Sequence, residues 1–254
     1  RINLASIMMV LLSPSKTMEL TSHPTITPSQ PIFEEVTKEI WSEIQAVDKE
    51  ELQQWMKLSP TLTEAVYTMY NTANRQHGIA LWSYTGTAFS GLDAQTLSPD
   101  NLRYAQDYLG ILSALYGWVK PLDSLCQYRL EMALRSPKTN IAYHDFWRQR
   151  ITEALSTHVN ALDTKYLLNL MSAEYSKSVD WKLFPIDVVS CSFLQKSPKG
   201  LKNMAVHSKR ARGLMARYVM EHRIHETNRL KKFSEEDYQF SEAESSEDRL
   251  VFIR

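Results

Sequence analysis

The stretch Met9-Val10-Leu11-Leu12-Ser13-Pro14-Ser15-Lys16-Thr17 is a short apolar run followed by a polar loop. An apolar run bounded by a Ser-Pro turn signal predicts a buried strand that ends at Leu12. Ser13, Lys16 and Thr17 then lie just beyond the strand, where hydroxyls, loop N–H groups and an ammonium can hold a phosphate. The loop lacks the glycines of a Walker A sequence, so it is not a P-loop.

Helices are expected where apolar residues recur every three or four positions, which is the spacing of a one-sided helix. Two of them begin with Ser59-Pro60 and Ser98-Pro99, because a serine caps a helix and a proline is tolerated at its first position. The expected helices cover residues 31–47, 60–78, 99–117, 145–155 and 208–225.

Strands are expected at short apolar or alternating runs. From Tyr128 to Leu134 the alternation has a period of two, which places Arg129 and Glu131 side by side on one face. Lys196 to Gly200 is the expected loop of a hairpin between two later strands. The expected strands cover residues 9–12, 79–84, 128–134, 166–170, 188–194, 201–206 and 249–253.

The order of these elements predicts a single α+β domain with a mixed central sheet flanked by helices. Strands and helices alternate only in places, no internal repeat is visible, and no Gly/Ser linker divides the chain. The domain is expected to span residues 9–254. Residues 1–8 are expected to be sequence upstream of it, because the chain opens at Arg1 and Met8-Met9 directly precedes the first apolar run.

Charge is balanced overall but separated along the chain. The 29 Lys and Arg residues match 29 Asp and Glu residues, so the total charge indicates no polyanionic partner. Residues 196–232 nevertheless hold 11 basic residues against two acids, and residues 233–248 follow with seven acids. A strongly basic surface is therefore available, and the acidic segment would mask it if the two touch in the fold.

Within the expected helix 208–225, Lys209, Arg212 and Arg217 fall in one stripe with Gly213 on the same face. A glycine inside a helix costs about 1 kcal/mol relative to alanine. Such a cost is tolerated where a ligand or another backbone approaches closely. Two interpretations stay open: the stripe binds an anion, or it is a solvated basic face near a helix C-terminus.

Cysteine and histidine usage indicates neither a disulfide nor a metal site. Cys126 and Cys191 stand 65 residues apart without CxxC spacing, and both are expected to be buried thiols. His222 and His225 are three apart but lack a third ligand, so we expect no metal and no cofactor. No apolar run approaches the roughly 20 residues that span a bilayer. The protein is expected to be soluble and cytoplasmic, with no membrane partner.

Six ordered blocks of sequence resemble the bacterial YaaA family, which is associated with the peroxide stress response. The blocks are Ser13–Thr17, Leu112–Gly117, Lys120–Asp123, Tyr128–Met132, Asn169–Val179 and Lys209–Arg217. The resemblance extends from Met9 to Arg254. It implies a family-specific fold and a cytoplasmic protein that limits oxidative damage when peroxide makes free intracellular iron dangerous. It also implies a positively charged cleft, with DNA binding attributed to a helix-hairpin-helix element.

The stretch most similar to a helix-hairpin-helix is Asn101 to Leu125, interpreted as two helices joined around Ala114 to Gly117. A typical turn of this kind has two glycines, which let backbone N–H groups reach a phosphate, whereas this chain keeps only Gly117. Lys120 replaces the family's arginine, so the charge remains but bidentate geometry is lost. An ordinary packed helical hairpin is the alternative. The family's Gly-Asp-Val-Tyr is Gly86-Thr87-Ala88-Phe89 here, so an acid and a phenol are absent.

The leading interpretation is a non-catalytic, monomeric protein that binds duplex or distorted DNA with little sequence preference, because its cations follow phosphates. The candidate DNA-binding residues are Lys16, Gly117, Lys120, Arg129, Lys177, Lys209, Arg210, Arg212 and Arg217. The alternative is an enzyme that acts on a nucleotide or nucleic acid in the same cleft, with anion clamps beside acid/base groups. The candidate catalytic residues are Ser13, Glu131, Glu174 and Tyr175.

Overall fold

In the computed structural model, the apolar run near the start of the chain forms a central strand of the sheet. This strand, β1 (Ile7–Leu12), pairs in parallel with β3 (Leu109–Ser113) on one side and with β6 (Thr164–Asn169) on the other. Met8 to Leu12 are at most 1% exposed. A continuous apolar run is what a parallel strand requires when helices cover both faces of its sheet.

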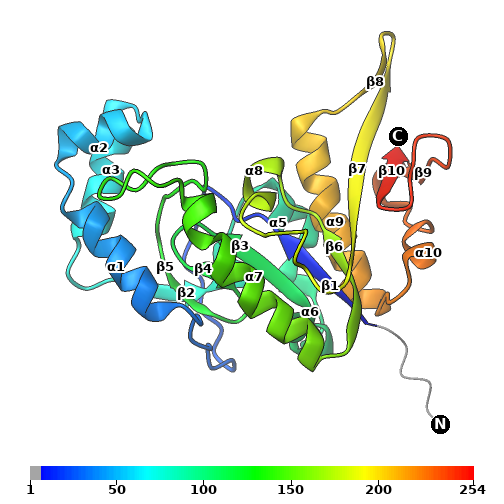
Figure 1. Cartoon of the computed structure of the whole chain (residues 1–254), viewed down its shortest axis with the longest axis horizontal. Helices are drawn as coiled ribbons and strands as arrows, with labels where there is room; N and C mark the ends of the chain where they lie inside the picture. The colour runs from blue at the N-terminus through cyan, green and yellow to red at the C-terminus, as the bar shows by residue number, and fades with distance from the viewer. Residues whose placement is uncertain (1–6) are drawn as a thin grey trace.

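The other strands extend β1 and its neighbours into one mixed sheet (Figure 1). They are β4 (Gly117–Val119), β7 (Asp187–Ser197), β8 (Gly200–Lys202), β9 (Gln239–Phe240) and β10 (Arg249–Ile253). The order is β4-β3-β1-β6-β7-β10-β9, with β8 paired to β7. The core from β3 to β10 is parallel, and β4, β8 and β9 add to it antiparallel. A separate antiparallel pair consists of β2 (His77–Ile79) and β5 (Ser124–Cys126).

Helices flank this sheet. The longer ones are α1 (Glu34–Gln45), α2 (Lys49–Met56), α3 (Pro60–Asn71), α6 (Pro99–Tyr108), α7 (Tyr143–Ala161) and α9 (Ala205–His222). Shorter turns are α4 (Ala80–Ser83), α5 (Thr87–Leu92), η1 (Ala94–Thr96), α8 (Ala173–Ser176), α10 (Thr227–Leu230) and η2 (Glu235–Asp237). α7 packs on β4 and β6, whereas α6 and α9 pack on β1 and on one another. Figure 1 shows α1, α2 and α3 grouped at one end of the molecule.

The α+β class, with a mixed sheet flanked by helices, is therefore confirmed. The two Ser-Pro helix starts are also confirmed, because the prolines open α3 and α6. Ser59 Oγ accepts a hydrogen bond from the N–H of Leu62 at 3.3 Å, and Ser98 Oγ accepts one from the N–H of Asn101 at 3.2 Å. Local capping chemistry alone predicted where these helices begin.

The prediction of a helical hairpin over residues 101–125 is wrong. α6 ends at Tyr108, and the chain continues as β3, a tight turn and β4. The residues of β3 satisfy a helical spacing, but they are fully buried beside β1, and a short apolar run of this kind is ambiguous until its neighbours are known. Gly117 follows the turn with φ +74°, and a Cβ there would lie 2.6 Å from the ring of Trp147. The positive φ and the close packing on Trp147 explain why residue 117 is a glycine.

The prediction of a strand over residues 128–134 is also wrong, because this segment pairs with no other strand among the described residues. Its alternation is nevertheless real: Tyr128, Leu130 and Met132 are buried, while Arg129 and Glu131 are half-buried. Two smaller corrections concern residues 79–84, which are mainly the turn α4, and residues 201–206, where β8 ends at Lys202 and α9 begins.

The structure describes residues 7–254. Of the expected upstream stretch, residues 1–6 lie outside the described residues, whereas Ile7 and Met8 belong to β1. Among the helices of the described part, none has the length and apolar character needed to cross a membrane.

Candidate functional site

A cavity of about 400 Å³ lies at the point where the chain changes direction across the sheet. From β1 the chain moves to β3 on one side, and it then returns past β1 to β6 on the other. The loops that follow β1 and β6 therefore begin side by side but lead to opposite sides of the sheet, and ligands of open parallel sheets bind in the crevice at such a switch point. The switch-point pocket is lined by these two loops, α8, residues 128–131, the start of α5, and Lys209 and Arg212 of α9.

Two serines tie the loops after β1 and β6 together beside the pocket. Ser13 Oγ accepts a hydrogen bond from the N–H of Ser172 at 2.9 Å and lies 3.4 Å from Ser172 Oγ. Ser172 in turn caps α8. On the other side of the loop, a Cβ on Gly86 would lie 2.4 Å from Ser15 Oγ. The loop after β1 is thus held closely between α8 and the start of α5.

Four basic side chains line the pocket. Lys16 Nζ forms an ion pair with Glu131 Oε1 at 2.8 Å. Within residues 7–254, Arg129, Lys209 and Arg212 form neither an ion pair nor a side-chain hydrogen bond. The lining has two acids, Glu131 and Glu174, so its formal charge is +2. The pocket is suited to an anion.

Arg212 is the pocket cation whose pKa is changed by burial. Its side chain is half-buried, and burial lowers the pKa of the guanidinium below its ordinary value. It remains charged near neutral pH, because arginine does not deprotonate in proteins. A desolvated cation without a counter-charge costs free energy, which a bound anion would offset. The neighbouring thiol of Cys191 supplies no such charge, because burial raises its pKa.

The two acids offer acceptors to a ligand. Glu174 Oε1 accepts a hydrogen bond from the N–H of Ala133 at 3.0 Å, and Glu131 Oε1 faces Lys16. In the described part of the chain, the second carboxylate oxygen, Oε2, of each glutamate contacts no polar partner. Both groups are therefore oriented by one oxygen and able to accept through the other.

Neutral tyrosines form the inner wall. Burial raises the pKa of Tyr128 to about 12 and raises the pKa of Tyr175 well above its ordinary value. The hydroxyl of Tyr128 lies 2.8 Å from that of Tyr84 and accepts a hydrogen bond from Ser113 Oγ at 2.7 Å. These rings are uncharged and fixed, so they provide apolar surface and neutral hydrogen-bonding groups.

The structure brings most of the predicted site residues together. Those that line the switch-point pocket are Ser13, Lys16, Arg129, Glu131, Glu174, Tyr175, Lys209 and Arg212. Those that lie outside its lining are Gly117, Lys120, Lys177, Arg210 and Arg217.

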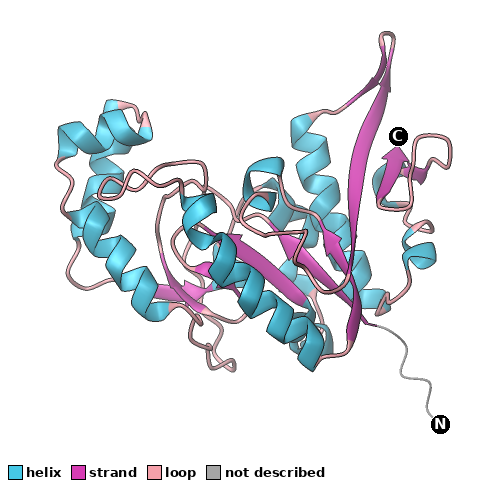
Figure 2. Ribbon diagram, in the orientation of Figure 1, coloured by secondary structure: helices cyan, strands magenta, loops and turns pink. Residues whose placement is uncertain are grey.

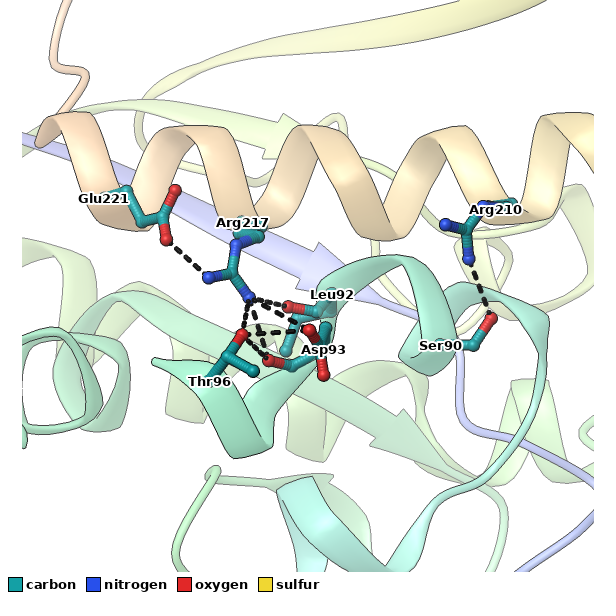
Figure 3. Close-up of polar contacts among 7 residues, drawn as sticks. All are labelled: Ser90, Leu92, Asp93, Thr96, Arg210, Arg217 and Glu221. Carbon is teal, nitrogen blue, oxygen red and sulfur yellow. Dashed lines mark hydrogen bonds and ion pairs between the residues drawn. The ribbon is translucent and has the colours of Figure 1, made fainter. Parts of the chain in front are cut away.

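Arg217 does not line the pocket with Lys209 and Arg212. Figure 3 shows its side chain pointing toward Leu92, Asp93 and Thr96. Its Nη1 donates to the backbone oxygens of Leu92 at 3.0 Å and Asp93 at 2.8 Å. Nη1 also donates to Thr96 Oγ1, and Nη2 forms an ion pair with Glu221. Arg217 holds the end of α5 against α9.

Gly213, the glycine of the expected basic stripe, also belongs to the packing contact between α5 and α9. A Cβ on Gly213 would lie 1.7 Å from the backbone oxygen of Ala88, and one on Gly91 would lie 2.3 Å from that of Arg210. α5 and α9 therefore cross with glycines on both sides of their contact. Of the two reasons for a glycine here, the close approach of another backbone is the one that the structure shows.

In the described part of the chain, one ion pair joins the acidic segment, residues 233–248, to helix α9. Arg210 forms an ion pair with Glu236 of η2 and donates to Ser90 Oγ at 3.3 Å, the contact drawn in Figure 3. Lys209 and Arg212, on the same helix, have no acidic partner in the described part of the chain. Within residues 7–254, ion pairing between the acidic segment and α9 is thus confined to Arg210, and a ring contact of Phe233 with Tyr218 adds to it.

The remaining candidates lie elsewhere. Lys120 Nζ is 5.4 Å from the centre of the Trp118 ring, a cation–π contact, and Lys177 is exposed beyond α8. Cys126 is buried, as expected, whereas Cys191 is half-buried. No cluster of three or more His, Cys, Asp or Glu side chains suited to a metal ion is present in residues 7–254.

Ser172 and Phe89 also line the pocket, and neither was among the predicted site residues. Ser172 follows β6 as Ser13 follows β1, and the rule that adjacent parallel strands bring their following loops together could have paired them. Phe89 lines the pocket at the position where the resemblance indicated a missing phenol.

The sequence is similar to a family model and to curated relatives over nearly its whole length. A family model described as "Peroxide stress protein YaaA" matches residues 8–244. A UPF0246 protein of Francisella tularensis subsp. holarctica (strain OSU18) is 34% identical over 254 residues, which cover 97% of this chain and all of the relative. A UPF0246 protein of Francisella philomiragia subsp. philomiragia is 32% identical with the same coverage.

Proposed function

The chain belongs to the peroxide stress protein YaaA family, and from this premise we propose that it binds DNA phosphates at the switch-point pocket. Binding with little sequence preference would shield DNA from damage linked to free intracellular iron. The observation that carries the proposal is the group of pocket cations, Arg129, Lys209 and Arg212, that have no protein counter-charge among the described residues. A phosphate is the anion that DNA offers.

A longer basic surface supports the same proposal. The sequence contains no Asp or Glu between Asp187 and Glu221. This acid-free segment includes the β7–β8 hairpin, whose Lys196, Lys199 and Lys202 are exposed, and it continues into α9. Figure 2 shows the hairpin projecting beyond the neighbouring helices. A two-stranded ribbon fits the major groove of DNA, so the hairpin can contact a duplex whose backbone lies over the pocket.

Fluorescence anisotropy across a salt series tests this function with duplex, bubble and single-stranded DNA. On a duplex, the slope of log affinity against log salt changes by about 0.9 for each phosphate contact. A triple variant with Arg129, Lys209 and Arg212 changed to alanine should therefore bind weakly, with a slope shallower by up to about 2.7. The control changes three exposed lysines outside the pocket to alanine, and they are Lys38, Lys49 and Lys165.

If both triple variants bind DNA like the wild type, the proposed function is wrong. If both lose affinity equally, binding is a general surface effect and the pocket has no role.

The second candidate function is an enzyme that acts on a nucleotide or nucleic acid. One observation favours it: Ser13, Glu131 and Glu174 line the same pocket as the unpaired cations. A carboxylate beside a cation is suited to accept a proton rather than to donate one. Incubation of the protein with nucleotides and damaged oligonucleotides, followed by mass spectrometry, tests this candidate. Absence of product alongside intact DNA binding would remove it.

A further inference from the structure

We infer that the switch-point pocket takes a single nucleotide whose base carries an amino group, and that in DNA this nucleotide is one extruded from the helix. This inference rests on the proposed DNA-binding function for its source of nucleotides. It defines which nucleotide enters the pocket, whereas the proposed function concerns the DNA phosphates that the pocket cations bind.

The volume of the pocket limits what can enter it. The pocket encloses about 400 Å³, within the range of sites that hold one small ligand. The major groove of DNA alone is about 12 Å wide, so a duplex segment cannot enter such a volume. If DNA lies over the pocket, only a nucleotide rotated out of the stack can fill it, as in enzymes that extrude their target base.

The lining of the pocket combines cations with aromatic rings. Cations come from Lys209 and Arg212 on α9 and from Arg129 in residues 128–131. Phe89 and Tyr128, which also line the pocket, are at most 5% exposed. A nucleotide combines the two matching groups, a charged phosphate and a flat aromatic base. Inorganic phosphate would leave the aromatic wall unused.

The acids give the preference among bases. Glu131 and Glu174 are each oriented through Oε1, and their Oε2 atoms can accept hydrogen bonds. A glutamate accepts from an exocyclic amino group, which cytosine and adenine present and thymine lacks. The pocket should therefore favour dCMP and dAMP over dTMP.

Calorimetric titration of the full chain with dCMP, dAMP, dTMP and inorganic phosphate tests the inference. We expect dCMP and dAMP to bind at least about 5-fold more tightly than dTMP, the discrimination of one good base contact. We expect both to bind more tightly than inorganic phosphate. A double variant with Glu131→Gln and Glu174→Gln should lose the preference, because each glutamine amide presents donors as well as an acceptor.

A blocking variant locates the binding. Thr87 lies in the pocket lining, so Thr87→Trp should fill the pocket and abolish nucleotide binding. The matched control is Ala173→Trp, at an exposed position of α8 outside the lining, and it should bind dCMP normally. Circular dichroism and thermal melting establish that both variants fold.

The outcomes separate the two proposals. Equal affinity for all four ligands, or dCMP binding unchanged in a folded Thr87→Trp variant, overturns the nucleotide inference even if DNA binding is intact. Selective dCMP and dAMP binding blocked by Thr87→Trp supports it. If the wild type then shows no affinity for any DNA, the DNA-binding function fails and the source of the nucleotide is the free monomer.

Discussion

Replacing Arg217 by alanine should destabilise the fold while leaving the phosphate contacts of DNA intact. The side chain is 21% exposed, and its Nη1 donates to three oxygens, those of Leu92 and Asp93 in the backbone and Oγ1 of Thr96. Nη2 pairs with Glu221 at 2.7 Å. Arg217 therefore connects α9 to the end of α5, and it faces away from the pocket lining.

The size of the effect follows from these contacts. A hydrogen bond that involves a charged group contributes about 1.5–3 kcal/mol, and a partly exposed ion pair contributes less than about 1 kcal/mol. The contacts share one guanidinium, so their contributions are not additive. We expect the free energy of unfolding to fall by about 2–3 kcal/mol. In a chain of this size, each 1 kcal/mol shifts Tm by about 2–4 °C, which gives a decrease of about 4–12 °C.

The assay combines thermal melting with DNA anisotropy, measured at a temperature where every variant is folded. Lys209→Ala on the same helix is the comparison, because this exposed residue makes no partner contact in the described chain. It should keep its Tm and lose DNA affinity, the reverse of Arg217→Ala. If the Arg217→Ala variant instead melts like the wild type but binds DNA weakly, Arg217 is a DNA-binding residue that shares one basic stripe with Lys209 and Arg212.

Three further changes test other parts of the structure. Gly213→Ala should lower the free energy of unfolding by about 2–3 kcal/mol, because its Cβ would lie 1.7 Å from the Ala88 oxygen, and an unchanged urea melt would contradict the helix crossing. Burial lowers the pKa of His158 below its ordinary 6.5, so it contributes stability that is full above about pH 6.5 and is lost as the pH falls through the folded value. His158→Gln should flatten this part of a curve of Tm against pH, and an unaltered curve would exclude His158 as its source. Glu236→Gln should release Arg210 and raise DNA affinity at low salt by up to about 5-fold, whereas unchanged affinity would show that Arg210 does not reach DNA.

The part of the site that follows β1 could be predicted because one local pattern determines it. The apolar run that ends at Leu12 fixes a buried strand, and Ser13 and Lys16 come directly after it. Alternation likewise placed Arg129 and Glu131 on one side of their segment, although no strand forms there. The sequence also determined the starts of α3 and α6 through their caps.

Tertiary neighbours decided the rest. Leu109 and Leu112 continue the helical spacing of α6, yet they belong to a strand because β1 offers them a parallel partner. In the same way, helical spacing groups Arg212 with Arg217, but only the position of α5 reveals that one faces the pocket and the other holds a packing contact. Spacing along a single helix contains no information about which neighbour covers each side.

A crystal structure of the protein with a short oligonucleotide would show whether DNA phosphates bind at the switch-point pocket. We expect a phosphate oxygen within about 2.7–3.2 Å of the Arg129 or Arg212 guanidinium, and one nucleotide inside the switch-point pocket. DNA bound on another face, with the pocket cations facing solvent, would contradict it.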